Sequence, residues 1–210
     1  MESLSQKYQQ KTDKQHVLDN PDTYTGTMTM TEIDTFIHED HIIKSKTVEI
    51  IPGLYKLFDE GIVNCRDHAI RTKELDPTSN YQLSYINISI NDDGEISFVN
   101  DGNGIDIEKH PEYGIWIPEM IFGHLRTSTN YDKSEKKIVG GKNGFGFKLV
   151  LIWSTFGEIE TVDHIRGLKY NQKFHNNLSI IDPPTITKCK SKPYTMVKFI
   201  PDFKRLNIPN

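Results

Sequence analysis

The order of apolar and polar positions divides the chain into short segments with either strand or helix periodicity. From residue 26 to 50, Thr, Ile and charged residues alternate, which predicts two antiparallel strands. After Pro52, apolar residues at 54, 57, 58, 62 and 69 recur near the helical period and predict a helix with a proline in its first turn. The runs YINISI and EISFVN flank the turn sequence NDDG at 91–94, which predicts a β-hairpin.

The rest of the chain continues this mixture. Residues 117–126 predict a short helix that starts near Pro118. Residues 145–156 have helical length, although their β-branched side chains leave a strand open. The runs EIETVDH, LKYNQKF and YTMVKFIP predict three more strands, and the polar segment before about Thr23 predicts an arm with one short helix that stops at Asn20-Pro21. The fold class is therefore α+β: a two-layer sandwich in which about three helices face a mostly antiparallel, mixed sheet.

Composition narrows the class of protein. With 210 residues, 36% hydrophobic and 26% charged, the chain fits one large globular domain or at most two small ones. A net charge of -4 argues against this chain gripping a nucleic acid backbone by itself. Cys65 and Cys189 cannot build a disulfide framework and match no zinc spacing, which favours a reducing compartment. Because no apolar run approaches the length of a membrane span and no signal-peptide core is present, we expect a soluble, intracellular protein.

The most unusual segment is VGGKNGFGFKLV at residues 139–150, which has four glycines just before an apolar run. A P-loop needs a lysine directly after its last glycine, whereas Gly146 is followed by Phe147 and then Lys148. The dinucleotide-binding pattern fails as well, since no glycine follows Gly146 at a spacing of three. The lysine strand and catalytic loop of protein kinases do not occur. The segment is therefore either a flexible linker or a less common phosphate-binding loop.

Two other segments carry candidate chemistry. Glu60, Asn64, Asp67 and His68 fall on one stripe of the predicted helix, at i, i+4, i+7 and i+8. Such a polar stripe is most often a solvated face. Its chemistry offers another interpretation, because a carboxylate can orient a water while a carboxamide one turn away gives an oxygen to Mg²⁺.

The second segment is NDGNGI at residues 100–105. Glycines at 102 and 104 remove the Cβ atoms that would prevent close approach to a flat base, although an ordinary loop after a strand explains them equally well. The glycines at 140–146 precede an apolar run that can begin a helix, so their N–H groups can face a triphosphate, with Lys148 adding charge. Three such segments in this order favour a nucleotide site over three unrelated loops.

These motifs resemble the Bergerat-type ATP-binding fold shared by DNA gyrase, the ninety-kilodalton heat-shock chaperones, MutL proteins and sensor histidine kinases. Within that superfamily the sequence is most similar to the eukaryotic type II DNA topoisomerases, and the similarity covers almost the whole chain. The motifs that carry it are NPDTYTG at 20–26, IPGLYKLFDE-x-x-VN at 51–64, IPEMIFGHL at 117–125, TSTNYD-x-x-EKK-x-x-GG-x-NG-x-G at 127–146 and the proline pair at 183–184.

The resemblance implies a role for each motif. Glu60 is expected to be the general base for the attacking water, Asn64 the Mg²⁺ ligand, and Asn100 the hydrogen-bond partner of the adenine amino group. Thr195 is expected to help fix the base from a neighbouring strand. The remaining residues expected at the ATP site are Asp67, His68, Gly104, Ile105, Ile121 and Phe122 around the base and sugar, Ser128, Thr129 and Asn130 at the sugar and phosphates, and Lys142, Asn143, Gly144, Phe145, Gly146, Phe147 and Lys148 in the phosphate lid.

The sequence departs from the family pattern at three of these positions or beside them. His68 stands where relatives commonly have asparagine, which alters one polar contact to the nucleotide, and an exposed histidine there titrates near neutrality. Asp106 replaces the proline of the usual Gly-Ile-Pro, which predicts a slightly looser turn. Phe147 replaces a small residue after the last glycine, so its bulk is expected to affect closure of the lid.

Topoisomerases of this kind are much longer than 210 residues. The resemblance therefore predicts a fragment, with an arm at 1–25 and an ATP-binding domain at 26–210, that binds Mg-ATP and hydrolyses it weakly. In the parent enzyme, ATP is expected to close a homodimer with exchange of the N-terminal arms, while other regions bind and cleave DNA. The site of action is the nucleus in a cell, or the nucleus or a cytoplasmic replication site for a virus. The alternatives are a non-catalytic nucleotide-sensing or protein-interaction module, or another ATPase of the superfamily.

Overall fold

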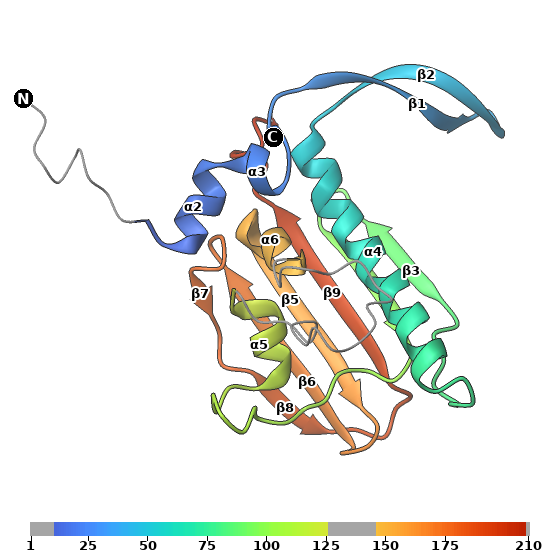
Figure 1. Ribbon diagram of the computed structural model, residues 1–210, viewed down its shortest axis with the longest axis vertical. Helices are drawn as coiled ribbons and strands as arrows, with labels where there is room; N and C mark the ends of the chain where they lie inside the picture. The colour runs from blue at the N-terminus through green and yellow to red at the C-terminus, as the bar shows by residue number, and fades with distance from the viewer. Residues whose placement is uncertain (1–10, 126–145, 209–210) are drawn as a thin grey trace, which may run out of the picture.

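The computed structural model describes residues 11–125 and 146–208. A seven-stranded sheet with the order β3-β4-β9-β5-β6-β7, and with β8 paired to β6, forms one layer. Helices α4, α5 and α6 cover one face of it and form the second layer (Figure 1). All of the described strand pairs are antiparallel, so the predicted α+β sandwich is confirmed.

The N-terminal part contains the predicted short helix, α2 (Asp13–Asp19). It begins where the Thr12 hydroxyl accepts a hydrogen bond from the Gln15 N–H, at 3.2 Å. Pro21 ends this helix as predicted, and the structure adds α3 (Pro21–Tyr24), in which the same proline occupies the first turn. Val17 of α2 is fully buried in the hydrophobic core, so this helix is docked on the body of the molecule.

The two predicted strands between residues 26 and 50 are confirmed as β1 (Thr31–Glu39) and β2 (Ile42–Ile50). Among the described strands they pair only with each other, and they form a ribbon that projects away from the main sheet (Figure 1). The turn between them is made by Asp40 and His41, both with positive φ. Positive φ at both residues suits a two-residue hairpin turn, although the sequence at this turn is Asp-His and not the usual Asn-Gly.

The central helix is α4 (Pro52–Leu75), as the spacing after Pro52 predicts. It lies against β4 (Ile96–Asp101), which pairs with β3 (Ile86–Ile90) in the predicted hairpin. Close approach is possible because Gly61 has no side chain: a Cβ there would lie 2.4 Å from the Phe98 ring. The predicted short helix is α5 (Ile117–Gly123).

The segment with two possible structures, residues 145–156, contains both. Helix α6 (Gly146–Ile152) is followed after one residue by β5 (Ser154–Asp163), and the Ser154 hydroxyl donates to the Val150 carbonyl at 2.6 Å across the junction. The other two predicted strands are confirmed as β6 (Leu168–His175) and β9 (Tyr194–Pro201). The strands β7 (Ile180–Ile181) and β8 (Thr185–Lys188) were not predicted, because they are short and lie on either side of the proline pair.

The core lies between the helices and the sheet. Helix α6 is buried almost all round, and it packs against β5 and β9 of the sheet and against α4 and α5. The central members of this core include Leu57, Phe98, Val150, Ile159 and Phe199, each at most 2% exposed. None of the helices in the described ranges is long and apolar enough to cross a membrane.

Candidate functional site

The predicted polar stripe is present on α4. The Glu60 side chain is only 16% exposed, and its Oε1 atom forms an ion pair with Lys56 Nζ at 2.8 Å. Asn64, one turn further on, is exposed and donates its Nδ2 hydrogen to the Glu60 carbonyl at 2.6 Å. This bond fixes the carboxamide and directs its Oδ1 atom away from the helix backbone. Asp67 continues the stripe with a side chain that is 13% exposed.

The end of the glycine-rich segment lies directly against this stripe. A Cβ added to Gly146, the first residue of α6, would lie 3.6 Å from Glu60 Oε2 and 4.0 Å from Asn64 Nδ2. The glycine thus brings main chain next to a carboxylate and a carboxamide from a helix more than 80 residues earlier in the chain. Two of the three predicted segments therefore meet in space.

The third segment joins them from β4. Asn100 is 7% exposed, and its Oδ1 accepts a hydrogen bond at 3.5 Å from the thiol of Cys65, the neighbour of Asn64 on α4. Burial raises the pKa of Cys65 to about 11, so the thiol keeps its proton and remains a donor. The second lone pair of Asn100 Oδ1 is the acceptor that an adenine amino group requires.

Thr195 lies opposite Asn100 in the strand register, as expected of two residues that hold one ligand. Asn100 on β4 pairs with Thr195 on β9, which pairs in turn with Thr161 on β5. The Thr161 hydroxyl lies 3.0 Å from the Thr195 hydroxyl and accepts a hydrogen bond from the Ile105 N–H at 3.1 Å. A single threonine thereby connects the loop after β4 to the strand that carries Thr195.

Gly104 is required by the path of this loop. Its φ is +72°, and a Cβ would lie 2.0 Å from the Val162 carbonyl oxygen. We expect Gly104→Ala to lower the free energy of unfolding by about 3 kcal/mol or more, because it combines backbone strain with a clash against main chain. Gly114→Ala is the matched control: φ there is +67°, but a Cβ would meet nothing within 4 Å, so we expect a loss of about 1 kcal/mol. Equal losses in denaturant titrations of the two variants would rule out the clash.

His68 on α4 lies against the same loop, next to Gly102. Its Nε2 atom is buried and has no hydrogen-bond partner among the described residues, and a Cβ on Gly102 would lie 2.7 Å from it. Burial lowers the pKa of His68 to about 4, and the charge of Arg71 lowers it further than the opposing charge of Asp101 raises it. The histidine is therefore neutral at pH 7. An exposed histidine would titrate near neutrality, but we do not expect this of His68, because its Nε2 atom is buried and its pKa is lowered.

The other described residues that were expected at the site lie in the core beside it. Phe147 is 7% exposed and packs edge-on against Phe122 and Phe199, so the structure places its bulk in the core. Ile105 and Ile121 are partly buried against the same cluster. Lys148 is 3% exposed, and burial lowers its pKa to about 8, a cost that a nearby anion would offset. The expected contacts of these residues with nucleotide remain predictions.

Seven of the expected site residues lie outside the described ranges. They are Ser128, Thr129, Asn130, Lys142, Asn143, Gly144 and Phe145.

Sequence reasoning missed two residues that the structure places at the site. Lys56 pairs with Glu60 at an i, i+4 spacing on α4, which was a readable signal. Thr161 connects the loop to β9, but nothing in its local sequence marks it, because its role depends on the pairing of β5 with β9.

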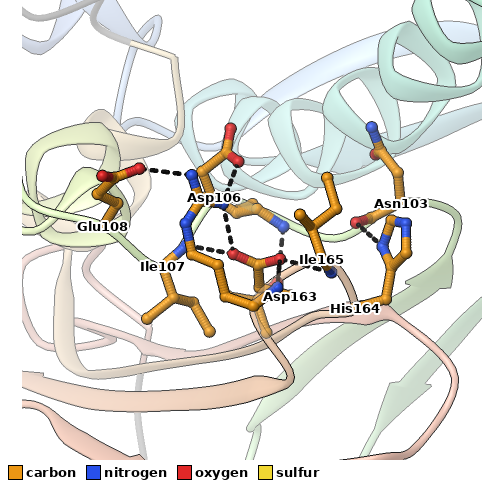
Figure 2. A network of polar contacts seen from close by, with 10 residues as sticks. Asn103, Asp106, Ile107, Glu108, Asp163, His164 and Ile165 are labelled. Atoms are coloured by element: carbon orange, nitrogen blue, oxygen red, sulfur yellow. Dashed lines mark hydrogen bonds and ion pairs between the residues drawn. The ribbon is translucent and has the colours of Figure 1, made fainter.

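A network of ion pairs lies at the turn that contains Asp106. Arg166 contacts the carboxylates of Asp106, Glu108 and Asp163, and Figure 2 shows these three side chains together. The expected looser turn stays a prediction, although the Asp106 side chain contacts an arginine at 2.7 Å.

The residues around this site fit a nucleotide with a bound cation. Three features suit a base and sugar: the carboxamide oxygen of Asn100, the buried imidazole nitrogen of His68, which has no hydrogen-bond partner in the described part of the chain, and the glycines at 102 and 104, which clear space. A carboxylate and a carboxamide beside Gly146 suit phosphates and Mg²⁺. Together with the helix-covered antiparallel sheet, this arrangement defines the Bergerat-type class of ATP-binding fold.

Known proteins place the chain within that class. It is 44% identical over 213 residues to DNA topoisomerase 2 of Acanthamoeba polyphaga mimivirus, a match that covers 98% of this chain and 16% of that protein. It is 45% identical over 210 residues to DNA topoisomerase 2 of Saccharomyces cerevisiae, which covers 98% of this chain and 14% of that protein. The crystal structure of the ATPase region of the Saccharomyces cerevisiae topoisomerase II superimposes with a TM-score of 0.90 at 44% identity, covering 98% of this chain and 53% of that one.

A crystal structure of the ATPase and transducer domains of DNA topoisomerase II from Balamuthia mandrillaris matches with a TM-score of 0.90 and 39% identity, over 98% of this chain and 52% of that one. No family model matches the sequence. The chain belongs to the type II DNA topoisomerase family and matches about half of the length of the ATPase-region structures. It spans about one seventh of the length of the curated relatives that it matches.

Proposed function

We propose that this chain binds Mg-ATP and, as part of a type II DNA topoisomerase, hydrolyses it. One observation carries the proposal: Gly146 at the start of α6 lies against Glu60 and Asn64, while Asn100 is hydrogen-bonded to Cys65 beside them. The carboxylate of Glu60, the carboxamides of Asn64 and Asn100 and the last glycine of the glycine-rich segment therefore lie near one another, which supports a nucleotide site.

Each described residue then has a defined role. Glu60 accepts the proton of the attacking water, and Lys56 holds one of its oxygens so that the other faces the phosphates. Asn100 accepts the adenine amino hydrogen, and Thr195 fixes the base from the neighbouring strand. Lys148 adds positive charge beside the phosphates.

Asn64 is the side chain that holds Mg²⁺, which commonly keeps water and phosphate oxygens as its remaining ligands. The cation, when bound, offsets negative charge on the phosphates and orients them for attack. The Oδ1 atom of Asn64 is available for this role because Nδ2 makes the bond to the Glu60 carbonyl.

In the complete enzyme, ATP closes two such domains as a gate, with the N-terminal arm of each crossing to the other, and one DNA duplex passes through a transient break in another. DNA binds mainly elsewhere in that enzyme, because this chain is acidic overall, with a net charge of -4. We infer an intracellular site of action, in the nucleus for a cellular enzyme and in the nucleus or a cytoplasmic replication site for a viral one.

The non-catalytic alternative rested on His68 and Phe147. Phe147 no longer supports it, because the aromatic ring packs in the core against Phe122 and Phe199. Glu60 is retained and faces Gly146, which a module without turnover does not need.

Calorimetric titration of the 210-residue chain with ATP and with a non-hydrolysable analogue tests the proposal. We expect binding of both that depends on Mg²⁺. Asn100→Ala should weaken ATP binding about tenfold or more, because a hydrogen bond to a buried base is lost. Asn87→Ala, on the exposed edge strand β3, is the matched control and should bind normally. Failure of the native chain to bind ATP with Mg²⁺ would reject the function.

A further inference from the structure

The loop after β4 is attached to the turn between β5 and β6 by one arginine and a buried carboxylate. Arg166 Nη1 donates to Asp106 Oδ1 at 2.7 Å and to Asp163 Oδ2 at 2.8 Å, and its Nη2 donates to Glu108. We call these four residues the Arg166 clamp. Figure 2 shows the carboxylates of both segments facing each other across the clamp.

Hydrogen bonds of the main chain also connect the loop after β4 to β5 and to the residue that follows it. The N–H of Ile105 donates to Thr161, and the N–H of Ile107 donates to Asp163 Oδ2 at 2.9 Å. His164 Nδ1 donates to the Asn103 carbonyl at 3.3 Å. Alternate residues of the loop are therefore fastened to the end of β5 and to the residue after it, so the loop has little freedom to shift as long as Asp163 keeps its position.

Arg166 is what holds Asp163 and the loop acids in one arrangement. Asp163 is 3% exposed, and burial alone would raise its pKa; hydrogen bonds from the main chain of Ile107 and Arg166 and from the Arg166 guanidinium outweigh this and hold the pKa below its usual value. The same carboxylates raise the pKa of Arg166, which stays charged throughout. Asp106 and Glu108 are 58% and 60% exposed, so their ion pairs add little stability individually, and their effect is geometric.

The position of the clamp suggests why this chain carries it. A proline at position 106 would restrict the backbone of the loop by its ring. This chain has Asp106 there, and the arginine sixty residues later supplies the restriction from outside. No main-chain hydrogen bond within the described residues uses the Asp106 N–H, so a proline can be introduced there without removing one.

We propose that Arg166 is a positioning residue for the nucleotide site: it holds the loop after β4 so that Asn100 and Ile105 meet the adenine in a fixed geometry. The inference rests on the proposed ATP-binding function and deepens it. Arg166 itself touches no nucleotide in this scheme. Its effect is on recognition of the base, because the loop lies at the base-reading end of the site and not beside Glu60.

The test compares the affinities for ATP and GTP in the 210-residue chain, measured by calorimetry with Mg²⁺. We expect Arg166→Ala to weaken ATP binding about tenfold and GTP binding less than threefold, because only adenine offers an amino group to Asn100. Discrimination between the two nucleotides therefore falls. The double variant Arg166→Ala with Asp106→Pro should recover most of the ATP affinity, because the proline restricts the loop again.

Arg205→Ala is the matched control. Arg205 also pairs with a buried aspartate three residues earlier, Asp202 at 3.1 Å, but lies far from the loop in sequence and contacts none of its residues among those described. It should leave both affinities unchanged. Thermal unfolding of each variant separates loss of fold from loss of recognition.

Three outcomes overturn the inference. An Arg166→Ala variant with native ATP affinity and native discrimination shows that the loop needs no clamp, while the proposed function stands. Equal weakening of ATP and GTP that Asp106→Pro does not restore shows a purely structural role. If the native chain binds no ATP, the proposed function fails first and the inference fails with it.

Discussion

Glu60→Gln is expected to reduce ATP turnover by a factor of about 10² to 10⁴ while leaving nucleotide affinity within about twofold of the native value. The amide keeps the size of the carboxylate and its ability to accept a hydrogen bond, but it cannot take a proton from water. The geometry favours this split, because Oε1 is held by Lys56 at 2.8 Å and Oε2 faces Gly146. The lost group therefore faces the proposed phosphate end of the site and not the proposed base end.

The measurement belongs in a chain that also carries a transducer domain, as the Balamuthia mandrillaris structure does, because the 210-residue chain alone is expected to hydrolyse ATP only weakly. Phosphate release and nucleotide affinity are measured on the same preparation. The fold should tolerate the change, because Lys56 still pairs with Asp59 at 3.0 Å. Glu74→Gln, an exposed site on the same helix, should turn over normally. Undiminished phosphate release by Glu60→Gln would remove the base assignment.

Most elements of the fold could be predicted from sequence because their signals are local. The helical spacing after Pro52 and the turn at 91–94 depend on neighbours within a few residues. The order of the strands could not be predicted in the same way. Strand β9, the last of the described strands, lies between β4 and β5, and this placement comes from pairing between residues 34 to 103 positions apart. Such pairing leaves no mark in any local window.

The candidate site likewise contains residues whose proximity could be predicted from local sequence and residues whose proximity depends on strand pairing. Glu60 and Asn64 share a helix face, so their juxtaposition follows from the helical period. Thr161 carries no motif, and only the register of β5 against β9 brings it to Thr195 and the loop. Phe147 is a case in which the local motif misleads. It directly follows the glycines of a candidate phosphate loop, yet its ring packs in the core because α6 is buried almost all round.

Asn64→Ala is expected to abolish the Mg²⁺ dependence of ATP binding and to weaken affinity by about a hundredfold, because it removes a carboxamide that lies close to Gly146 and whose oxygen is proposed to ligate the cation. The fold should be unaffected: Asn64 is exposed, and alanine is a better helix former than asparagine. Any loss of binding then reports the site and not the stability of α4.

Asn64→Asp separates ligation from shape. Aspartate keeps an oxygen at the same place, so Mg²⁺-dependent binding should largely return, although the added charge lies close to the Glu60 carboxylate. Titrations with ATP at several Mg²⁺ concentrations give the dependence for the native chain and both variants. If Asn64→Ala responds to Mg²⁺ as the native chain does, the cation is held by another side chain, and the meeting of α4 with Gly146 serves only to shape the pocket.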